Sequence, residues 1–179
     1  MSLTIRIAPI PEDASLTRRQ REQATVASLI TEILGAHAEL AHTPEGAPFL
    51  PAHPELAISV THSRTHAAVA IGAAGDTFGI DLEAPRPQLL RTASRFLSPH
   101  DILDTTRPRL TALLQAWTAK EAIYKALRAA SLPLDAIRLN IPARQATVTA
   151  NPLPATFTLT FRPAPDAQLL AIAHQAPNP

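Results

Sequence analysis

Two acidic side chains in one short segment have the types and spacing needed for metal-dependent phosphate chemistry. The segment FGIDLE, residues 78–83, alternates like a β-strand, so that Gly79, Asp81 and Glu83 share one face. Their carboxylates stand about 7 Å apart along the strand and repel each other unless a cation lies between them. Mg²⁺ prefers oxygen ligands and would relieve that repulsion. The alternative is an acidic sheet face exposed to water, since D-x-E pairs are common on surfaces.

A third acid, Glu121, occurs in the long predicted helix at residues 109–130. At about 100° per residue it falls inside an otherwise apolar stripe of that helix. The stripe consists of Leu110, Leu113, Leu114, Trp117 and Tyr124. An acid in such a stripe is costly unless it is paired or bound to a metal. An intrahelical salt bridge with Lys125 is the simplest pairing, but exposed pairs of this kind contribute only about 0.5 kcal/mol.

The apolar stripe predicts how the helix meets the strand. If its Trp117 face packs on the sheet, Glu121 approaches Asp81 and Glu83 as a third oxygen ligand. Lys120 and Lys125 are then left for an anion. Three acids and a lysine around one ion indicate phosphate chemistry, in which the cations neutralise a pyrophosphate.

Two histidines flank a short connection between predicted strands. His62 ends the segment SVTH and His66 opens the next strand. This H-x-x-x-H spacing suits zinc only on a helix, so we do not expect a metal pair. A histidine at a strand end, beside Thr61, Ser63 and Arg64, is suited to holding a phosphate; a solvated turn histidine is the alternative.

The elements that must position these residues occur in a repeated order. Strand, long helix and strand pair occur twice, which predicts two similar halves, residues 1–75 and 76–179. The expected fold is α+β, with a long helix packed on a small, mostly antiparallel sheet in each half. Helices are predicted at 12–35, 87–104 (one or two short ones) and 109–130, and strands at 3–8, 56–63, 66–73, 77–83, 136–140, 155–162 and 167–174.

Composition narrows the classes of function. The net charge of +1 provides no global field for nucleic acid or an anionic membrane, so an anionic ligand must be bound locally. The absence of cysteine excludes disulfides, thiolate catalysis and sulfur-ligated metals. No signal segment or long apolar run is apparent, and we therefore expect a cytoplasmic protein.

Four segments together resemble the 4′-phosphopantetheinyl transferase superfamily. FGIDLE followed by WTAKEAIYK is similar to the paired family signatures G-[IV]-D-[ILV]-E and W-[ST]-x-K-E-[AS]-x-x-K. Upstream, GAPFL and AISVTHS resemble the segments G-[KR]-P-x-[LI] and [SN]-x-S-H-S, and RFLSPHDI resembles the segment between the signatures. The matches follow the expected order over residues 46–130. Length and internal doubling favour the pseudo-dimeric, surfactin-synthetase-activating type, which implies a monomer.

The resemblance implies transfer of 4′-phosphopantetheine from coenzyme A to a serine of an apo carrier protein, with release of 3′,5′-ADP. Mg²⁺, or Mn²⁺ in its place, would be held on the coenzyme A pyrophosphate by Asp81, Glu83 and Glu121. Glu121 would also act as general base for the serine hydroxyl, directly or through water. Lys125 would neutralise charge at the phosphates. His62, helped by Thr61, would bind the 3′-phosphate of coenzyme A.

Some positions depart from the family pattern. Ala47 stands where the family has a lysine or arginine that meets the 3′-phosphate, and Thr61 stands where serine is usual. The two metal-binding signatures are unaffected. Binding of the nucleotide should be weaker unless an arginine of the helix at 12–35 replaces the charge missing at Ala47. Arg18, Arg19 and Arg21 are the candidates for that role.

Other functions stay open at the level of the sequence. One is a non-catalytic homologue that binds carrier proteins, which the missing basic group at Ala47 favours and the retained acids oppose. Another is a Mg²⁺-dependent phosphohydrolase with water as acceptor. Carrier proteins are usually acidic, and Arg86, Arg91 and Arg95 are close to the signatures in sequence; they are either carrier contacts or solvated surface arginines, the more common case.

Overall fold

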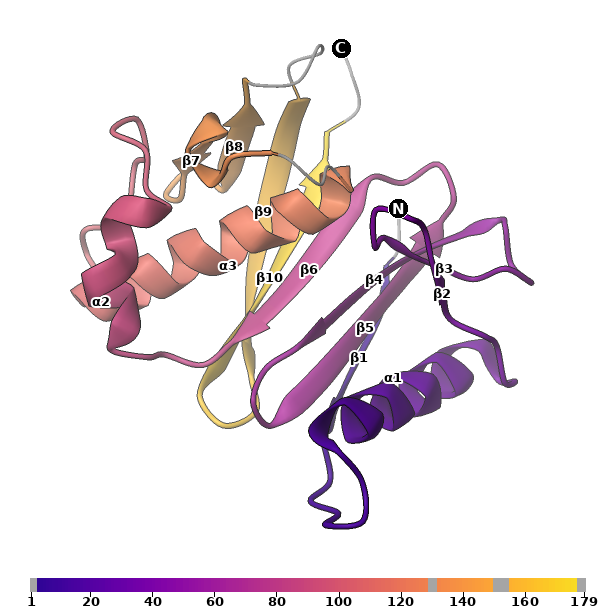
Figure 1. The fold of residues 1–179 in the computed structure, drawn as a ribbon. Helices are drawn as coiled ribbons and strands as arrows, with labels where there is room; N and C mark the ends of the chain where they lie inside the picture. Colours follow the sequence, from indigo (N-terminus) through magenta and orange to yellow (C-terminus); the bar gives the residue numbers. More distant parts are fainter. Residues whose placement is uncertain (1–2, 129–131, 150–154, 177–179) are drawn as a thin grey trace. The chain divides into compact units, whose positions relative to one another are not determined.

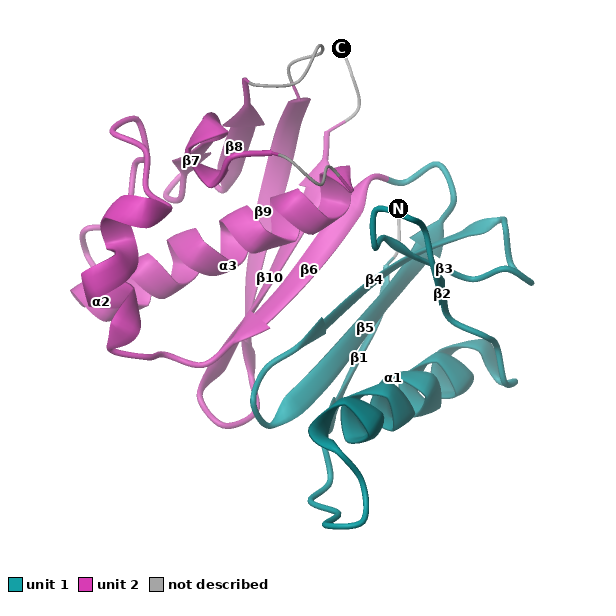
Figure 2. Ribbon diagram, in the orientation of Figure 1, with its two compact units in different colours: residues 1–76 teal, residues 77–179 magenta. Residues whose placement is uncertain are grey.

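The chain forms two compact units, residues 1–76 and 77–179, which are described separately (Figure 2). The structure is a computed structural model that describes residues 3–128, 132–149 and 155–176. Within these ranges no helix is long and apolar enough to cross a membrane.

Unit 1 is a three-stranded antiparallel sheet with one long helix (Figure 1). Its elements are β1 (Thr4–Pro9), α1 (Arg18–Leu34), β2 (Ala41–His42), β3 (Pro48–Phe49), β4 (Leu56–His62) and β5 (His66–Ala73). The sheet order is β1-β5-β4, and β2 and β3 form a separate two-stranded ribbon. Side chains of α1 such as Leu29 and Ile30 pack against Ile58, Val69 and Ile71 of the sheet.

Capping residues determine where α1 begins and ends. The predicted helix at 12–35 begins too early, because the helix starts at Arg18, after Thr17. Thr17 and Gln20 form a capping box in which each side chain bonds the other's backbone amide, so the first turn cannot extend further back. Gly35 ends the helix as predicted, with a φ of 72° and its amide donating to the Thr31 carbonyl.

Unit 2 is a five-stranded antiparallel sheet with the longest helix on one face (Figure 1). Its elements are β6 (Phe78–Glu83), α2 (Gln88–Thr92), η1 (Ala93–Arg95), α3 (Arg109–Leu127), η2 (Leu134–Ala136), β7 (Ile137–Asn140), β8 (Gln145–Val148), β9 (Ala155–Ala164) and β10 (Gln168–Gln175). The sheet order is β6-β10-β9-β8-β7. The sequence did not predict β8, which has only four residues. The last two residues of the predicted helix at 109–130 lie outside the described ranges.

The two units share a strand order. In unit 1 the first strand pairs with the last, β1 with β5, and the last pairs with the preceding β4. In unit 2 the first strand, β6, pairs with the last, β10, which pairs with β9. The repeated order in the sequence therefore corresponds to a repeated topology. The pseudo-dimeric arrangement stays a prediction.

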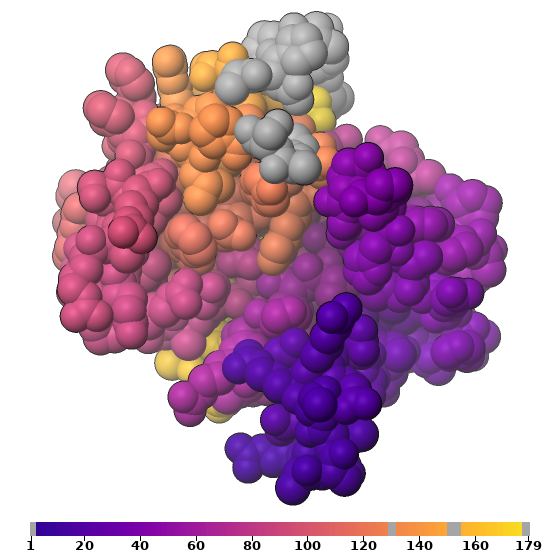
Figure 3. All heavy atoms as spheres, viewed as in Figure 1, coloured from indigo at the N-terminus to yellow at the C-terminus, as the bar shows by residue number. Residues whose placement is uncertain are grey.

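The loop after η1 is tied to the edge of the unit 2 sheet. Ile102 forms a parallel bridge with Asn140, and its amide donates to the Leu139 carbonyl at 2.8 Å. In Figure 3 the rose atoms of this segment border the orange atoms of β7. The loop between α2 and α3 is thus anchored to β7.

At Gly79 the backbone of α3 approaches β6 directly. A Cβ atom built on Gly79 would lie 2.6 Å from the amide nitrogen of Ala126 and closer still to the carbonyl oxygen of Ala122. Both are backbone atoms, so no side-chain rotation would relieve the clash. The facing side chains of α3 are small, and Ala119, Ala122 and Ala126 are buried. Only glycine at this position lets the helix lie directly on the strand.

The Gly79 contact yields a test of packing. Gly79→Ala should destabilise the protein by about 3 kcal/mol or more, because backbone atoms of α3 must move. Urea unfolding measures the loss. Gly75→Ala is the matched control, since no atom lies within 4 Å of its added Cβ. Equal stabilities of the two variants would show that α3 does not rest on Gly79.

Candidate active site

β6 presents two acids to α3. Gly79, Asp81 and Glu83 alternate on the strand face that meets the helix, as the sequence predicts. Asp81 is 5% exposed and Glu83 is half-buried. β6 is an edge strand of the unit 2 sheet, and α3 packs on it and on its neighbour β10.

The apolar stripe of α3 is not uniformly buried: Leu113 and Leu114 are buried, whereas Leu110 is half-buried. Alanines lie at the contact with β6, because large side chains would hold the helix away from Gly79. Trp117, Glu121, Tyr124 and Lys125 are instead half-buried. Trp117 and Lys125 still contact β6, through Glu83 and Asp81 respectively. Glu121 is therefore only partly buried, and its position requires less compensation than full burial would.

Each acid of β6 contacts a cationic or donor group. Lys125 Nζ lies 2.7 Å from Asp81 Oδ1. Glu83 Oε1 accepts from the Trp117 indole Nε1 at 3.3 Å and from Arg86 Nη2 at 3.2 Å. The Arg86 guanidinium also lies over the Trp117 ring, 5.8 Å from its centroid. The sequence singled out Arg86 only as a candidate carrier contact, whereas the structure also pairs it with Glu83.

Asp81 is close enough to Glu83 and Glu121 to raise the pKa values of both glutamates. Burial raises the pKa of Glu121, and the charge of Asp81 raises it further, while Lys125 opposes the effect. The pKa of Glu83 is raised in the same way, by burial first and by Asp81 second, with Arg86 opposing. We refer to Asp81, Glu83 and Glu121 as the acid cluster. It concentrates more negative charge than its own cations neutralise.

The acid cluster fits a hard divalent cation in its chemistry. It offers carboxylate oxygens, the ligands that Mg²⁺ prefers, and a cation would relieve the repulsion that raises both glutamate pKa values. Within the described ranges, no three acidic or histidine side chains converge tightly enough to form a preformed ion site. Lys125 and Arg86 contact Asp81 and Glu83 instead. An ion would have to compete with these two side chains.

Lys120 is not available to bind an anion, contrary to the prediction, because it pairs with Asp101. Its side chain is fully buried and its Nζ lies 2.7 Å from Asp101 Oδ2. The same nitrogen donates to the carbonyls of Leu134 at 2.9 Å and Ile137 at 2.7 Å. Asp101 also accepts from the amide of Leu139 at 2.8 Å. This buried ion pair joins α3, η2, β7 and the loop after η1.

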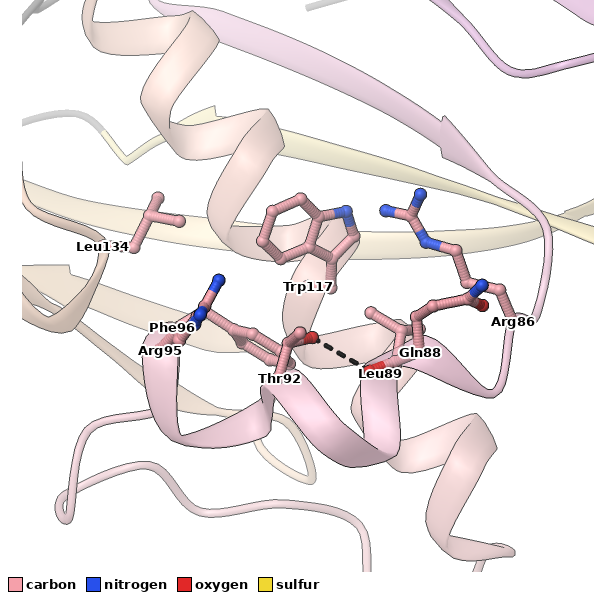
Figure 4. Close-up of a pocket in the computed structure, with 8 residues that line it drawn as sticks. All are labelled: Arg86, Gln88, Leu89, Thr92, Arg95, Phe96, Trp117 and Leu134. Carbon is pink, nitrogen blue, oxygen red and sulfur yellow. Dashed lines mark hydrogen bonds between the residues drawn. The ribbon is translucent and has the colours of Figure 1, made fainter.

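A pocket of about 440 Å³ opens beside the acid cluster, and Trp117 forms part of its wall (Figure 4). Its apolar lining comes from α2, η2 and α3, and its charged lining from two arginines. These residues include Leu89, Phe96, Trp117, Leu134, Arg86 and Arg95. Phe96 meets Trp117 edge to face, with ring centroids 5.3 Å apart. Arg91, the third arginine singled out in the sequence, is exposed on α2.

His62 lies in unit 1 at the end of β4, on the face that carries α1. Its pairing partner Ala67 belongs to the core under α1, whereas Thr61 pairs with Ala68 and points to the opposite face. The structure therefore does not bring the Thr61 and His62 side chains together. His66 is buried at the start of β5, with Nδ1 3.0 Å from Thr65 Oγ1.

An acid that the sequence did not single out lies next to His62. Glu22 Oε1 is 2.7 Å from Arg18 Nε and 3.6 Å from His62 Nδ1. Arg18 Nη2 also donates to the Ser63 carbonyl at 3.3 Å. We call these three side chains, Arg18, Glu22 and His62, the His62 cluster. The i,i+4 spacing of Arg18 and Glu22 was visible in the sequence, but their proximity to His62 depends on how α1 packs across β4.

The raised pKa of Glu121 predicts a pH-dependent gain in stability. Because its pKa in the folded state lies above the ordinary 4.5, the ionised side chain destabilises the fold at neutral pH. Glu121→Gln should therefore raise the Tm of the metal-free protein by about 2 °C at pH 7.5. The gain should shrink as the pH falls towards 4.5, where the carboxyl is protonated in the folded state. A pH-independent change, or a loss at pH 7.5, would contradict the assignment; thermal unfolding monitored by circular dichroism decides.

The buried Lys120–Asp101 pair predicts a large loss from one substitution. Lys120→Met leaves the Asp101 carboxylate buried without its partner, which should cost about 3–5 kcal/mol in unfolding free energy. The double variant Lys120→Met/Asp101→Asn should recover part of that loss. A single variant within about 0.5 kcal/mol of the parent protein, the range of surface substitutions, would refute the structural role.

Comparison with known proteins extends the geometric description. The family model described as "4'-phosphopantetheinyl transferase superfamily" matches residues 77–173, more than half of the chain. A "4'-phosphopantetheinyl transferase" of Bacillus subtilis is 29% identical over 101 residues, covering 54% of this chain and 44% of the relative. The match thus spans less than half the length of that relative.

Proposed function

Because the chain belongs to the 4′-phosphopantetheinyl transferase superfamily, we propose that it transfers 4′-phosphopantetheine from coenzyme A to a serine of an apo carrier protein. The observation that carries this proposal is the acid cluster. The charge of Asp81 on β6 raises the pKa values of Glu83 and of Glu121 on α3, and Lys125 lies 2.7 Å from Asp81. Such a concentration of oxygen ligands next to a lysine suits a magnesium pyrophosphate.

Asp81, Glu83 and Glu121 would hold the divalent ion, and the ion would neutralise charge on the pyrophosphate of coenzyme A. Lys125, released from Asp81, would contact the phosphate oxygens. The serine oxygen forms a bond to the phosphorus that carries the pantetheine arm. The bond from that phosphorus to the oxygen bridging to the nucleotide breaks, and 3′,5′-ADP leaves. The serine proton passes to Glu121, directly or through water.

The raised pKa of Glu121 supports its role as the proton acceptor. A carboxylate with an ordinary pKa is a weak base at neutral pH, and burial next to Asp81 makes Glu121 a stronger one. Its side chain is only partly buried, which leaves a hydroxyl access to the carboxylate. Trp117 and Arg86 donate hydrogen bonds to Glu83, so the two glutamates are in different surroundings.

In unit 1, His62 would bind the 3′-phosphate of coenzyme A, as the resemblance implies. Thr61 is assigned to the same subsite in the family pattern, although its side chain is directed to the other face of β4. Arg86 and Arg95, at the pocket beside Trp117, are the basic groups best placed to contact an acidic carrier protein.

The proposal is tested by incubation with coenzyme A, Mg²⁺ and a panel of apo carrier proteins from fatty acid, polyketide and nonribosomal peptide synthesis. Mass spectrometry should show a carrier heavier by one phosphopantetheine. Glu121→Gln should reduce the rate at least about 100-fold, because it removes both a ligand and the base. Glu32→Gln is the matched control, an exposed acid of α1 paired with Arg6.

The outcomes separate the alternative functions. Carriers that all stay unmodified would favour a non-catalytic carrier-binding homologue. Release of 3′,5′-ADP from coenzyme A in the absence of any carrier would favour a phosphohydrolase with water as acceptor. Full activity of Glu121→Gln would remove Glu121 from the mechanism.

A further inference from the structure

We infer that Arg86 exchanges partners when the acid cluster binds a divalent ion. It leaves Glu83 and becomes available to an acidic group of the carrier protein at the pocket beside Trp117, so that the ion and the carrier strengthen each other's binding. This inference rests on the proposed function, in which Glu83 holds the ion and the acceptor is a carrier protein. All the residues involved belong to unit 2.

The first observation is that Arg86 serves as a counter-ion where the divalent ion would bind. Arg86 Nη2 lies 3.2 Å from Glu83 Oε1, an oxygen that also accepts from Trp117 Nε1 at 3.3 Å. Burial and the charge of Asp81 raise the pKa of Glu83, and the Arg86 guanidinium is the strongest of the influences that lower it. A divalent ion on the same carboxylate would repel the guanidinium and take over its role.

The second observation is that Arg86 is easier to displace than Lys125, the other cation at the cluster. The Arg86 side chain is 46% exposed and lies 3.2 Å from its acid, whereas Lys125 is 29% exposed and lies 2.7 Å from Asp81. Water can therefore replace the carboxylate around the guanidinium. Pairs this exposed change an equilibrium by about fivefold at most, the equivalent of about 1 kcal/mol. An ion can displace Arg86 at that small cost.

The third observation is the second partner that Arg86 already has. Its guanidinium lies over the Trp117 ring, 5.8 Å from the centroid, and Arg86 lines the pocket of about 440 Å³. The contact with the ring does not depend on Glu83, so it can hold the displaced guanidinium at the pocket. The switch thus requires only a local rotation of the Arg86 side chain.

The pocket lining indicates the chemistry of the partner. Arg95 lines the same pocket, and Figure 4 shows the two arginines on opposite sides of Trp117. Two guanidinium groups beside an apolar lining complement a protein surface that carries carboxylates next to apolar side chains. While Arg86 is paired with Glu83, one of these two charges is compensated. The ion therefore restores the full positive charge at the pocket.

The ion and the carrier are coupled through this one side chain. By thermodynamic linkage, the ion improves carrier binding by the same factor as the carrier improves ion binding. The strength of the Arg86–Glu83 pair limits that factor to about fivefold. The chain would thus favour carriers when the ion is already in place.

The exchange is tested first with Mg²⁺ alone. Trp117 is the only tryptophan of the chain, so the tryptophan emission reports on the Glu83 and Arg86 contacts. Mg²⁺ should change the emission of the parent protein. Arg86→Gln should lower the Kd for Mg²⁺ by about two- to fivefold, because the competing charge is gone. Arg91→Gln, which removes an exposed arginine of α2, is the matched control and should leave the Kd unchanged. An unchanged or higher Kd for Arg86→Gln would overturn the inference.

The second measurement is the affinity for an apo carrier whose acceptor serine is replaced by alanine, so that no transfer follows. Saturating Mg²⁺ should tighten carrier binding to the parent protein by about three- to fivefold. Arg86→Gln should abolish this response to the ion. Arg95→Gln should weaken carrier binding equally with and without Mg²⁺ and so preserve the response. A carrier affinity that does not respond to Mg²⁺, or a response that survives in Arg86→Gln, would contradict the exchange.

The failure of this inference is distinct from the failure of the proposed function. Carriers that all stay unmodified in the presence of coenzyme A and Mg²⁺ would overturn the proposed function, whatever Arg86 does. Transfer that proceeds normally, with equal Mg²⁺ affinities of the parent protein and Arg86→Gln, would overturn the inference alone.

Discussion

The direct contact between the backbones of β6 and α3 at Gly79 is the constraint on which the rest of unit 2 depends. No Cβ fits there, and the helix presents alanines to the strand, so the two elements lie unusually close. This closeness brings the side of α3 that carries Glu121 and Lys125 level with Asp81 and Glu83. The candidate site is therefore a consequence of small residues packed beneath it. Larger residues at the contact would widen the spacing and weaken the effect of Asp81 on Glu121.

The site is assembled at some cost to the fold. Burial and mutual repulsion raise the pKa of Glu83 and of Glu121, which means that both ionised side chains are less stable there than in water. Lys125 and Arg86 compensate in part by contacting Asp81 and Glu83. A protein without a ligand for these acids would gain stability by losing them, and such local conflict is typical of functional sites. Elsewhere in the same unit, the buried charges of Lys120 and Asp101 are paired.

Much of the fold could be predicted from the hydrophobic periodicity of the sequence, and the errors of that prediction have a common physical origin. The alternation at 78–83, the strand pair 56–73 and the Gly35 stop are local patterns, and the structure confirms them. The apolar stripe of α3 indicated the side that contacts β6 through Trp117, but it did not reveal that alanines pack against Gly79. Roles set by partners distant in sequence were also missed: the pairing of Lys120 with a loop carboxylate, and the approach of Glu22 to His62. Each depends on how a helix packs across another element, which no local pattern encodes.

The central claim is that Asp81, Glu83 and Glu121 share one divalent ion. The most direct test is a Mn²⁺ titration in the presence of coenzyme A. Binding is measured as the loss of the free-ion signal in electron paramagnetic resonance. The account predicts one bound Mn²⁺ per chain, with affinity reduced at least about tenfold by each of Asp81→Asn, Glu83→Gln and Glu121→Gln. Unchanged Mn²⁺ binding in all three variants would contradict it, because the ion would then be held elsewhere.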